Sequence, residues 1–178
     1  MNYKFGDTLQ KLVRKSAIQW PEISAQLSRT KSGEYKETNY HDLFENAMDF
    51  AGALLDIGVK RGDRVGLIAD NREEWEQADV GLLSIGAIDT PRGLDATETD
   101  LAYILSFSEV EITIVENETQ VKKLLNIKKS IPTLKTIISF EEVSEDAKSD
   151  CEKQKVTCLW FRDLQKSGHE SFLKCCMR

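Results

Sequence analysis

The residues with the clearest chemical potential follow two short apolar runs of the sequence. Asn71 and Trp75 come just after the first run, and Arg92 and Gly93 come just after the second. An arginine can pair with phosphate, a glycine lets a ligand approach the backbone, and open α/β sheets place ligands at the carboxyl ends of their strands. At Arg92 and Gly93, a turn that ends the strand is favoured over ligand contact. At Asn71 and Trp75, helix capping and core packing are favoured.

Other reactive side chains give weaker signals. Ser84 lacks the G-x-S-x-G elbow of a hydrolase, and Asp70 lacks the acidic pair and the lysine of a phosphoacceptor site. His41 and His169 are expected to be inert. All four cysteines lie from residue 151 onwards, without a C-x-x-C pair, so reduced thiols are favoured over a metal site or a disulfide framework. The sequence therefore predicts no catalytic and no metal-ligating residue.

The composition indicates an ordinary globular protein. The chain has 178 residues, of which 40% are hydrophobic and 30% charged, which is enough for one domain. A formal net charge of −6 argues against nucleic-acid binding, which favours a basic face. No apolar run is long enough to cross a membrane, and the amino terminus lacks a signal-peptide core. A cytoplasmic location is therefore expected.

The elements around the candidate residues form a strand, a helix and a second strand. Residues 64–69 are a mostly apolar run typical of a strand buried on both faces. Asn71 is predicted to cap a helix that starts with three glutamates and ends at Gly86. Residues 87–90 then predict a strand that the sequence Pro-Arg-Gly ends, because proline cannot donate to a central ladder. A capping box at residues 97–100 starts the next helix.

The rest of the chain continues this alternation. Further helices are predicted over residues 8–17, 40–57, 101–107 and 118–129, and further strands over residues 110–115 and 134–140. A β-hairpin is predicted between residues 22 and 38. Strands that alternate with helices require right-handed crossovers. The predicted fold is therefore α/β, with a mainly parallel sheet, helices on both faces and an amino-terminal hairpin.

The pattern changes at residue 141. Residues 1–140 are expected to form the α/β unit, and residues 141–178 an acidic linker and a short tail. One further short strand is expected over residues 156–161, followed by a helical turn. The cysteine-rich ending after about Gly168 would suit codons read out of frame.

Three spaced blocks of the sequence resemble one family. They are Ala53–Val65, Asp70–Trp75 and Gly86–Gly93, and together they resemble the amino-terminal part of AMP-forming acyl-CoA synthetases, most closely the bacterial long-chain fatty acid–CoA ligases. The resemblance extends from about Leu9 to about Asp163. It implies a partial amino-terminal domain of the adenylate-forming fold.

The resemblance also implies an activity for a complete enzyme. Such an enzyme uses ATP and Mg²⁺ to turn a fatty acid into an acyl-adenylate and then passes the acyl group to coenzyme A. In related synthetases the loop that corresponds to Arg92 and Gly93 lies near the path of coenzyme A, so these two residues are the expected cofactor contacts. Peripheral membrane contact is a further expectation.

The family's catalytic motifs do not occur in these 178 residues. The sequence contains neither a Ser/Thr-Gly-rich loop ending in Pro-Lys-Gly nor the pattern Tyr-Gly-x-Thr-Glu. We therefore expect an amino-terminal fragment, from a split or frameshifted gene, that is inactive alone and pairs with the carboxy-terminal part. Such a fragment is expected to leave one face of its sheet uncovered. A stand-alone α/β module that binds a nucleotide or a partner without catalysis, and an unstable gene remnant, are the alternatives.

Overall fold

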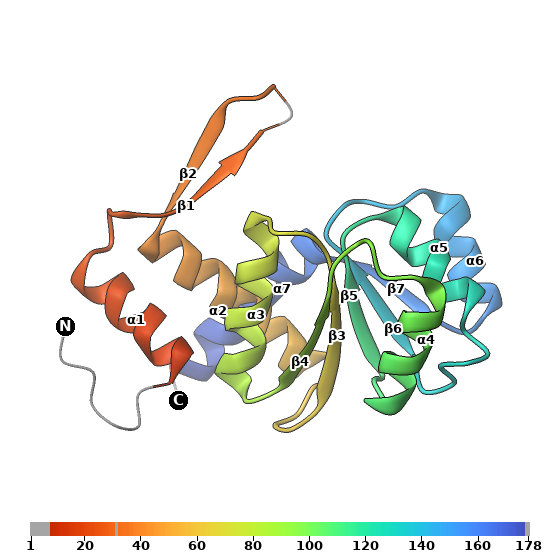
Figure 1. Cartoon of the computed structure of the whole chain (residues 1–178). Helices are drawn as coiled ribbons and strands as arrows, with labels where there is room; N and C mark the ends of the chain where they lie inside the picture. Colours follow the sequence, from red (N-terminus) through yellow and green to blue (C-terminus); the bar gives the residue numbers. More distant parts are fainter. Residues whose placement is uncertain (1–7, 31, 177–178) are drawn as a thin grey trace.

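A five-stranded parallel sheet forms the centre of the molecule (Figure 1). The structure is a computed structural model that describes residues 8–30 and 32–176, with residues 170–176 described by their backbone alone. The strand order is β4-β3-β5-β6-β7, and every neighbouring pair is parallel. The strands are β3 (Arg64–Ile68), β4 (Ile88–Arg92), β5 (Ile112–Val115), β6 (Thr136–Ser139) and β7 (Thr157–Trp160).

Helices cover both faces of this sheet, and a hairpin projects from one end (Figure 1). The helices are α1 (Leu9–Gln19), α2 (Tyr40–Asp56), α3 (Glu73–Ile85), α4 (Glu98–Phe107), α5 (Glu118–Asn126), α6 (Glu145–Lys153) and α7 (Phe161–Cys176). The hairpin pairs β1 (Ser24–Arg29) with β2 (Tyr35–Asn39) in antiparallel register. The predicted α/β class, the parallel sheet and the amino-terminal hairpin are confirmed.

Two apolar clusters hold the layers together. On one face of the sheet, side chains of α2, α3 and α7 pack on β3, and Phe50, Leu82 and Phe161 are completely buried there. On the other face, side chains of α4, α5 and α6 pack together, and Leu101 and Leu124 are completely buried. Burial of each large apolar side chain contributes about 1.5–3 kcal/mol before the entropy cost. Both faces are therefore occupied, and the expectation of one uncovered sheet face is wrong.

Several predicted helix ends are confirmed by the backbone. The Asn39 side chain accepts a hydrogen bond from the Asp42 N–H at 2.7 Å, which caps α2. Gly86 ends α3 in the left-handed conformation with φ 76°, where a side chain would be strained. Thr97 and Asp100 form the capping box of α4.

Two local predictions around the central helix are wrong. Arg72, not Asn71, occupies the N-cap position of α3, and its side chain makes no capping hydrogen bond. The strand β4 does not stop before Pro91 but continues through Arg92. Proline is tolerated there because β4 is an edge strand, so its missing N–H falls on the unpaired side.

The acidic segment after residue 141 is a helix, not a linker. Ser144 caps α6 through its side chain, and Ala147 and Cys151, four residues apart, are its buried residues. β7 then pairs with β6 as the fifth strand of the sheet, and α7 packs on α2. Residues 145–168 therefore extend the α/β unit across the expected boundary at residue 140. The side chains from residue 170 to the end, where the out-of-frame tail was expected, lie outside the described residues.

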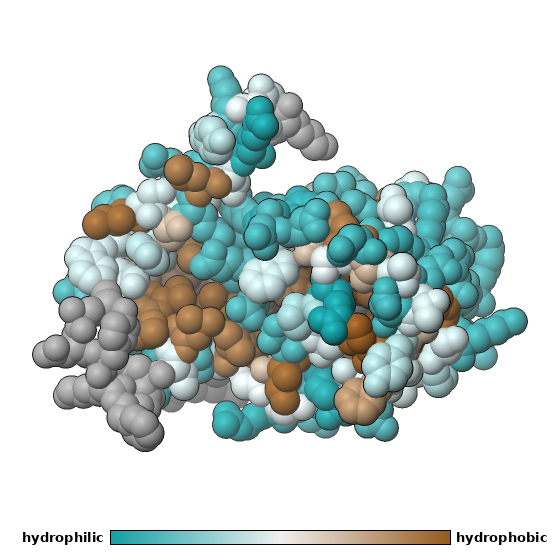
Figure 2. All heavy atoms as spheres, in the orientation of Figure 1, coloured by the Kyte–Doolittle hydropathy of each residue, from teal (hydrophilic) through white to brown (hydrophobic). Residues whose placement is uncertain are grey.

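Apolar side chains also gather on the outer surface. On the face seen in Figure 2, they cluster between α1 and α3, whereas the side around α5 and α6 is mostly polar. Large exposed apolar residues lie on α1, the hairpin, β4 and α4, among them Ile18, Leu27, Ile88 and Phe107. Leu55 on α2 is also exposed.

One buried carboxylate destabilises this fold at neutral pH. Asp79 on α3 is 9% exposed, and burial together with the charges of Asp89 and Glu76 raises its pKa from 3.8 to about 6. Because the folded-state pKa is the higher one, stability falls as the pH rises from 3.8 to about 6 and stays low above it. Asp79→Asn is therefore expected to raise the free energy of unfolding at pH 8 by about 1–2 kcal/mol.

Urea denaturation at several pH values measures this effect. The gain in the free energy of unfolding of Asp79→Asn is expected to disappear below pH 3.8, where Asp79 is protonated in both the folded and the unfolded state. Asp89→Asn, which removes only one neighbouring charge, is expected to give a smaller gain in the same direction. An Asp79→Asn protein no more stable than the parent at pH 8 would contradict this assignment.

Candidate functional site

An open pocket lies at the carboxyl ends of β3 and β4. It has a volume of about 600 Å³. The predicted candidates Asn71, Trp75, Arg92 and Gly93 all line it, together with Ala69, Asp70 and Pro91. The parallel register of β3 and β4, which places Ile68 opposite Arg92, brings the two loops to the same edge of the sheet. The structure therefore gathers the four predicted positions at one pocket.

The Arg92 side chain is the cationic group of this pocket. It is exposed, and its Nη1 donates to the Pro91 carbonyl at 3.0 Å. Its charge also helps to lower the pKa of Asp100 on α4, after the larger contribution of the Thr97 hydrogen bonds. An exposed guanidinium on the rim of an open pocket can pair with a phosphate or a carboxylate.

The surroundings of Gly93 are acidic. Gly93 is not among the residues with positive φ, so its own backbone conformation does not require a glycine. A Cβ atom at this position would lie 2.8 Å from Asp95 Oδ1 and 3.8 Å from Asp70 Oδ1. Asp70 Oδ1 also accepts a hydrogen bond from the Leu94 N–H at 3.3 Å. Since both neighbours are carboxylates, an anionic group is favoured at Arg92 and disfavoured at Gly93.

Asn71 and Trp75 separate this pocket from a second cavity. The second cavity, of about 900 Å³, lies between the hairpin and the start of α3, and both residues line it too. Trp75 is half-buried, and part of its ring packs against the core cluster under α3. The core-packing role favoured for Trp75 is therefore confirmed, while the capping role of Asn71 is not.

The point where the strand order reverses lies one strand away, between β3 and β5. The chain leaves β3 towards β4 on one side and leaves β5 towards β6 on the other. Open α/β sheets usually bind ligands at such a reversal. In this protein, charged side chains of the chain itself occupy that position. Glu116, which follows β5, accepts a hydrogen bond from the Asp70 N–H at 3.0 Å and lies 3.8 Å from the Arg72 guanidinium.

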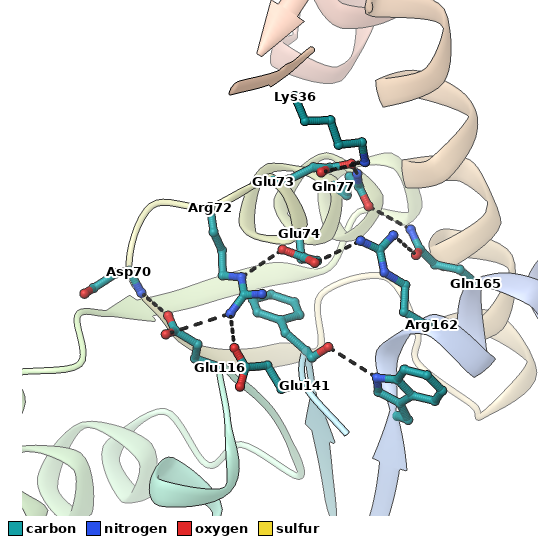
Figure 3. Close-up of polar contacts among 12 residues, drawn as sticks. Lys36, Asp70, Arg72, Glu73, Glu74, Gln77, Glu116, Glu141, Arg162 and Gln165 are labelled. Atoms are coloured by element: carbon teal, nitrogen blue, oxygen red, sulfur yellow. Dashed lines mark hydrogen bonds and ion pairs between the residues drawn. The ribbon is translucent and has the colours of Figure 1, made fainter. Parts of the chain in front are cut away.

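Arg72 joins three loops at this reversal (Figure 3). Its Nε donates to Glu74 Oε2 at 2.8 Å, and its Nη1 donates to Glu141 Oε1 at 3.2 Å. The guanidinium carbon also lies 5.6 Å from the centre of the Phe140 ring. Because these residues follow β3, β5 and β6, the Arg72 contacts fix the carboxyl ends of three strands relative to one another.

A second arginine completes this network (Figure 3). Arg162 Nη2 donates to Glu74 Oε1 at 2.9 Å, so both oxygens of Glu74 are paired. Burial alone would raise the pKa of Glu74, but the hydrogen bond and charge of Arg72, with the charge of Arg162, lower it below its usual value. Burial would likewise lower the pKa of Arg72, and Glu74 raises it instead. The Arg72–Glu74 pair is therefore held in its ionised form.

Hydrogen bonds continue from this network towards the hairpin (Figure 3). Gln165 on α7 accepts from Arg162 and donates to Gln77 Oε1 at 2.9 Å. Gln77 Nε2 donates to Glu73 Oε1 at 3.2 Å, and Glu73 pairs with Lys36 of the hairpin at 3.1 Å. Side chains of α3, α7 and β2 are thus joined in one chain of contacts.

Glu74→Gln is expected to lower the free energy of unfolding at pH 7 by about 2–3 kcal/mol, because it leaves two partly buried arginines without their shared carboxylate. The folded-state pKa of Glu74 is lowered from 4.5, so its contribution is present above pH 4.5 and is lost as the pH falls further. The difference between variant and parent should shrink in acid. Glu145→Gln, at an exposed pair, is the control and should change stability by less than about 0.5 kcal/mol. Equal effects of the two variants in urea titrations would contradict the role of Glu74.

The sequence analysis did not predict the network around Arg72, although the sequence contains a signal for it. Charged residues follow four of the five strands directly or within a few positions: Arg72, Glu116, Glu141 and Arg162. In a parallel sheet these positions meet at one edge. A comparison of the residues after each predicted strand would have brought out the group.

Most of the chain matches a known family of enzymes. Residues 13–169 match the family of AMP-binding enzymes, so the chain belongs to that family. The resemblance predicted from the three sequence blocks is confirmed.

Curated relatives include long-chain acyl-CoA synthetases. Long chain acyl-CoA synthetase 8 of Arabidopsis thaliana is 34% identical over 142 residues, which cover 78% of this chain and 19% of the relative. Fatty acyl-CoA synthetase A of Dictyostelium discoideum is 29% identical over 150 residues, which cover 82% of this chain and 21% of the relative. The chain therefore spans about a fifth of the length of these relatives.

Solved structures share the fold. The adenylation domain of a carboxylic acid reductase from Segniliparus rugosus, solved with AMP and a co-purified carboxylic acid, superimposes with a TM-score of 0.80 at 14% identity. It covers 93% of this chain, which matches 31% of that domain. A putative long-chain-fatty-acid CoA ligase from Rhodopseudomonas palustris gives a TM-score of 0.72 at 21% identity over 89% of this chain and 36% of its own. The fold is therefore that of part of an adenylate-forming domain.

Among the side chains that the structure describes, those of residues 8–30 and 32–169, no group of three or more His, Cys, Asp or Glu is arranged to hold a metal ion. In the same part of the chain, no helix combines the length and the apolar character that a membrane span requires.

Proposed function

We propose that these residues form the amino-terminal part of a long-chain fatty acid–CoA ligase. The complete enzyme would use ATP and Mg²⁺ to join a fatty acid to AMP and would then transfer the acyl group to the thiol of coenzyme A. The observation that carries this proposal is the family match over residues 13–169, together with relatives named as long-chain acyl-CoA synthetases. A cytoplasmic location and peripheral membrane contact remain predictions of this proposal.

Within that enzyme, this part of the chain would act as a scaffold. At the carboxyl ends of the strands, Arg72 and the side chains that it contacts fill the point between β3 and β5 where the strand order reverses. We infer that the groups that handle ATP and Mg²⁺ come from residues outside these 178. The carboxy-terminal part of the enzyme would then be the partner of this domain.

The edge pocket is the proposed contact for coenzyme A. Arg92 offers an exposed guanidinium on its rim, and Trp75 offers part of an aromatic face. A phosphate of coenzyme A would pair with Arg92, because the carboxylates of Asp70 and Asp95 repel anions at Gly93. Gly93 would instead keep the floor of the pocket free of a side chain.

Isothermal titration of coenzyme A into the purified chain tests this contact. Arg92→Ala is expected to weaken binding about tenfold or more, since a hydrogen bond to a charged group contributes about 1.5–3 kcal/mol. Lys129→Ala is the matched control, because it removes an exposed cation outside the pocket. Equal binding by Arg92→Ala and the parent would contradict the contact. Tighter binding of ATP than of coenzyme A would favour the alternative of a nucleotide-binding module.

A further inference from the structure

Two cysteines meet where α6 packs on β7. Cys151 lies on α6 and is completely buried, and the half-buried Cys158 on β7 packs against the same apolar cluster. A tight turn joins the two elements, in which the Val156 N–H donates to the Cys151 carbonyl at 2.9 Å. Both cysteines are free thiols. The pair therefore sits across the contact between a helix and the last strand of the sheet.

The two thiols differ in their electrostatic surroundings. A side-chain hydrogen bond between them raises the pKa of Cys151, with burial adding to the rise. The same bond lowers the pKa of Cys158 against the effect of burial, and the charge of Lys148 lowers it further. A thiolate, not a thiol, is the nucleophile in cysteine chemistry. Cys158 is thus the nucleophilic member, and Cys151 keeps its proton.

Access from solvent follows the same division. Cys158 lines a surface cavity of about 420 Å³ and a smaller one of about 50 Å³, and Lys148 lines both. Cys151 lines neither cavity. A small reagent can therefore reach Cys158 from outside, while Cys151 is completely buried.

We propose that Cys158 and Cys151 form a peroxide-reactive dithiol, in which Cys158 is the site of attack and Cys151 resolves the product. The Cys158 sulfur attacks one oxygen of hydrogen peroxide, the O–O bond breaks, and one water leaves with the formation of a sulfenic acid. The Cys151 sulfur then attacks the oxidised sulfur, and a second water leaves as the disulfide forms. In sum, two thiols lose two hydrogen atoms and one peroxide becomes two waters.

The disulfide would join α6 to β7 at one edge of the sheet. β7 is the edge strand opposite β4, so the dithiol lies away from the pocket at Arg92. Oxidation is therefore expected to leave coenzyme A binding unchanged. An experiment that contradicts the dithiol therefore leaves the proposed ligase function untouched, and the reverse also holds.

Peroxide titration of the full chain tests the dithiol. Cys175→Ser and Cys176→Ser leave only the two cysteines in question. Treatment with hydrogen peroxide is expected to remove two hydrogen atoms from the intact mass, and dithiothreitol should restore them. Trypsin cleaves after Lys153 and Lys155, so a disulfide between Cys151 and Cys158 joins two separate peptides. Absence of this linked pair from the oxidised protein would overturn the proposal without the need for any variant at the site.

Variants at the site separate the two roles. In the same background, Cys151→Ser should stop at a sulfenic acid on Cys158 that dimedone traps. Cys158→Ser should react about tenfold more slowly than Cys151→Ser, because the remaining thiol is buried and protonated. Equal rates for the two variants, with circular dichroism spectra that match the parent, would overturn the assignment of roles.

Discussion

Phe161→Ala is expected to lower the free energy of unfolding by about 3–5 kcal/mol, because it opens a cavity in the centre of one core layer. Phe161 is the first residue of α7 and is completely buried. Its ring centre lies 4.4 Å from that of Phe50 on α2 and 5.0 Å, in an edge-on arrangement, from that of Phe140 after β6. The side chain thus links three segments far apart in the sequence.

Urea denaturation followed by circular dichroism measures the loss. Phe107→Ala is the matched control, because Phe107 is 79% exposed, and it should change stability by less than about 0.5 kcal/mol. If residues 141–178 were a linker that does not pack in the core, Phe161→Ala would lower the free energy of unfolding no more than Phe107→Ala does. That result would contradict the packing of α7.

Gly168→Ala is expected to cost about 2–3 kcal/mol, although alanine is intrinsically the better helix former. α7 crosses α2 with the two backbones in contact at Gly52 and Gly168. A Cβ at Gly168 would overlap the backbone carbonyl of Asp49 and lie 2.6 Å from the backbone nitrogen of Ala53. A Cβ at Gly52 would in turn lie 2.7 Å from the Gly168 carbonyl oxygen. Because both obstacles are backbone atoms, the helices must separate.

The neighbouring position supplies the control for this variant. Ser167 is exposed on α7, and Ser167→Ala also adds helix propensity while it removes only the hydrogen bond that the Ser167 hydroxyl donates to the Leu164 carbonyl of the same helix. The thermal midpoint of Gly168→Ala should fall clearly, and that of Ser167→Ala should hold or rise. A Gly168→Ala protein as stable as the parent would show that α2 and α7 do not approach this closely.

The regular parts of the fold could be predicted from local patterns. Apolar runs, the glycine at residue 86 and the capping box at Thr97 act over a few residues, so their structural effect can be inferred without tertiary information. The same holds for the convergence of Arg92 and Asn71 at one pocket, since parallel strands expose their carboxyl ends together.

The features of the fold that were predicted wrongly depend on contacts between distant segments of the chain. The acidic sequence of α6 has only Ala147 and Cys151 as buried residues, so its helix gains stability from the core under it and shows little apolar pattern of its own. Arg72, at the N-cap position, binds Glu116 and Glu141 from two other loops, and these contacts are absent from any local pattern. The position of β4 at the sheet edge, which tolerates Pro91, is a property of strand order that no local pattern contains.

Fatty-acid-dependent exchange of pyrophosphate into ATP detects acyl-adenylate formation alone. The sheet and the Arg92 pocket lie within these 178 residues, whereas the proposed adenylating groups would lie outside them. The purified chain is therefore expected to exchange no faster with a long-chain fatty acid than without one, in an assay where a complete relative, such as the medium/long-chain ligase of Mycolicibacterium smegmatis, is active. Acid-dependent exchange by the chain itself would contradict the proposed scaffold role of these residues.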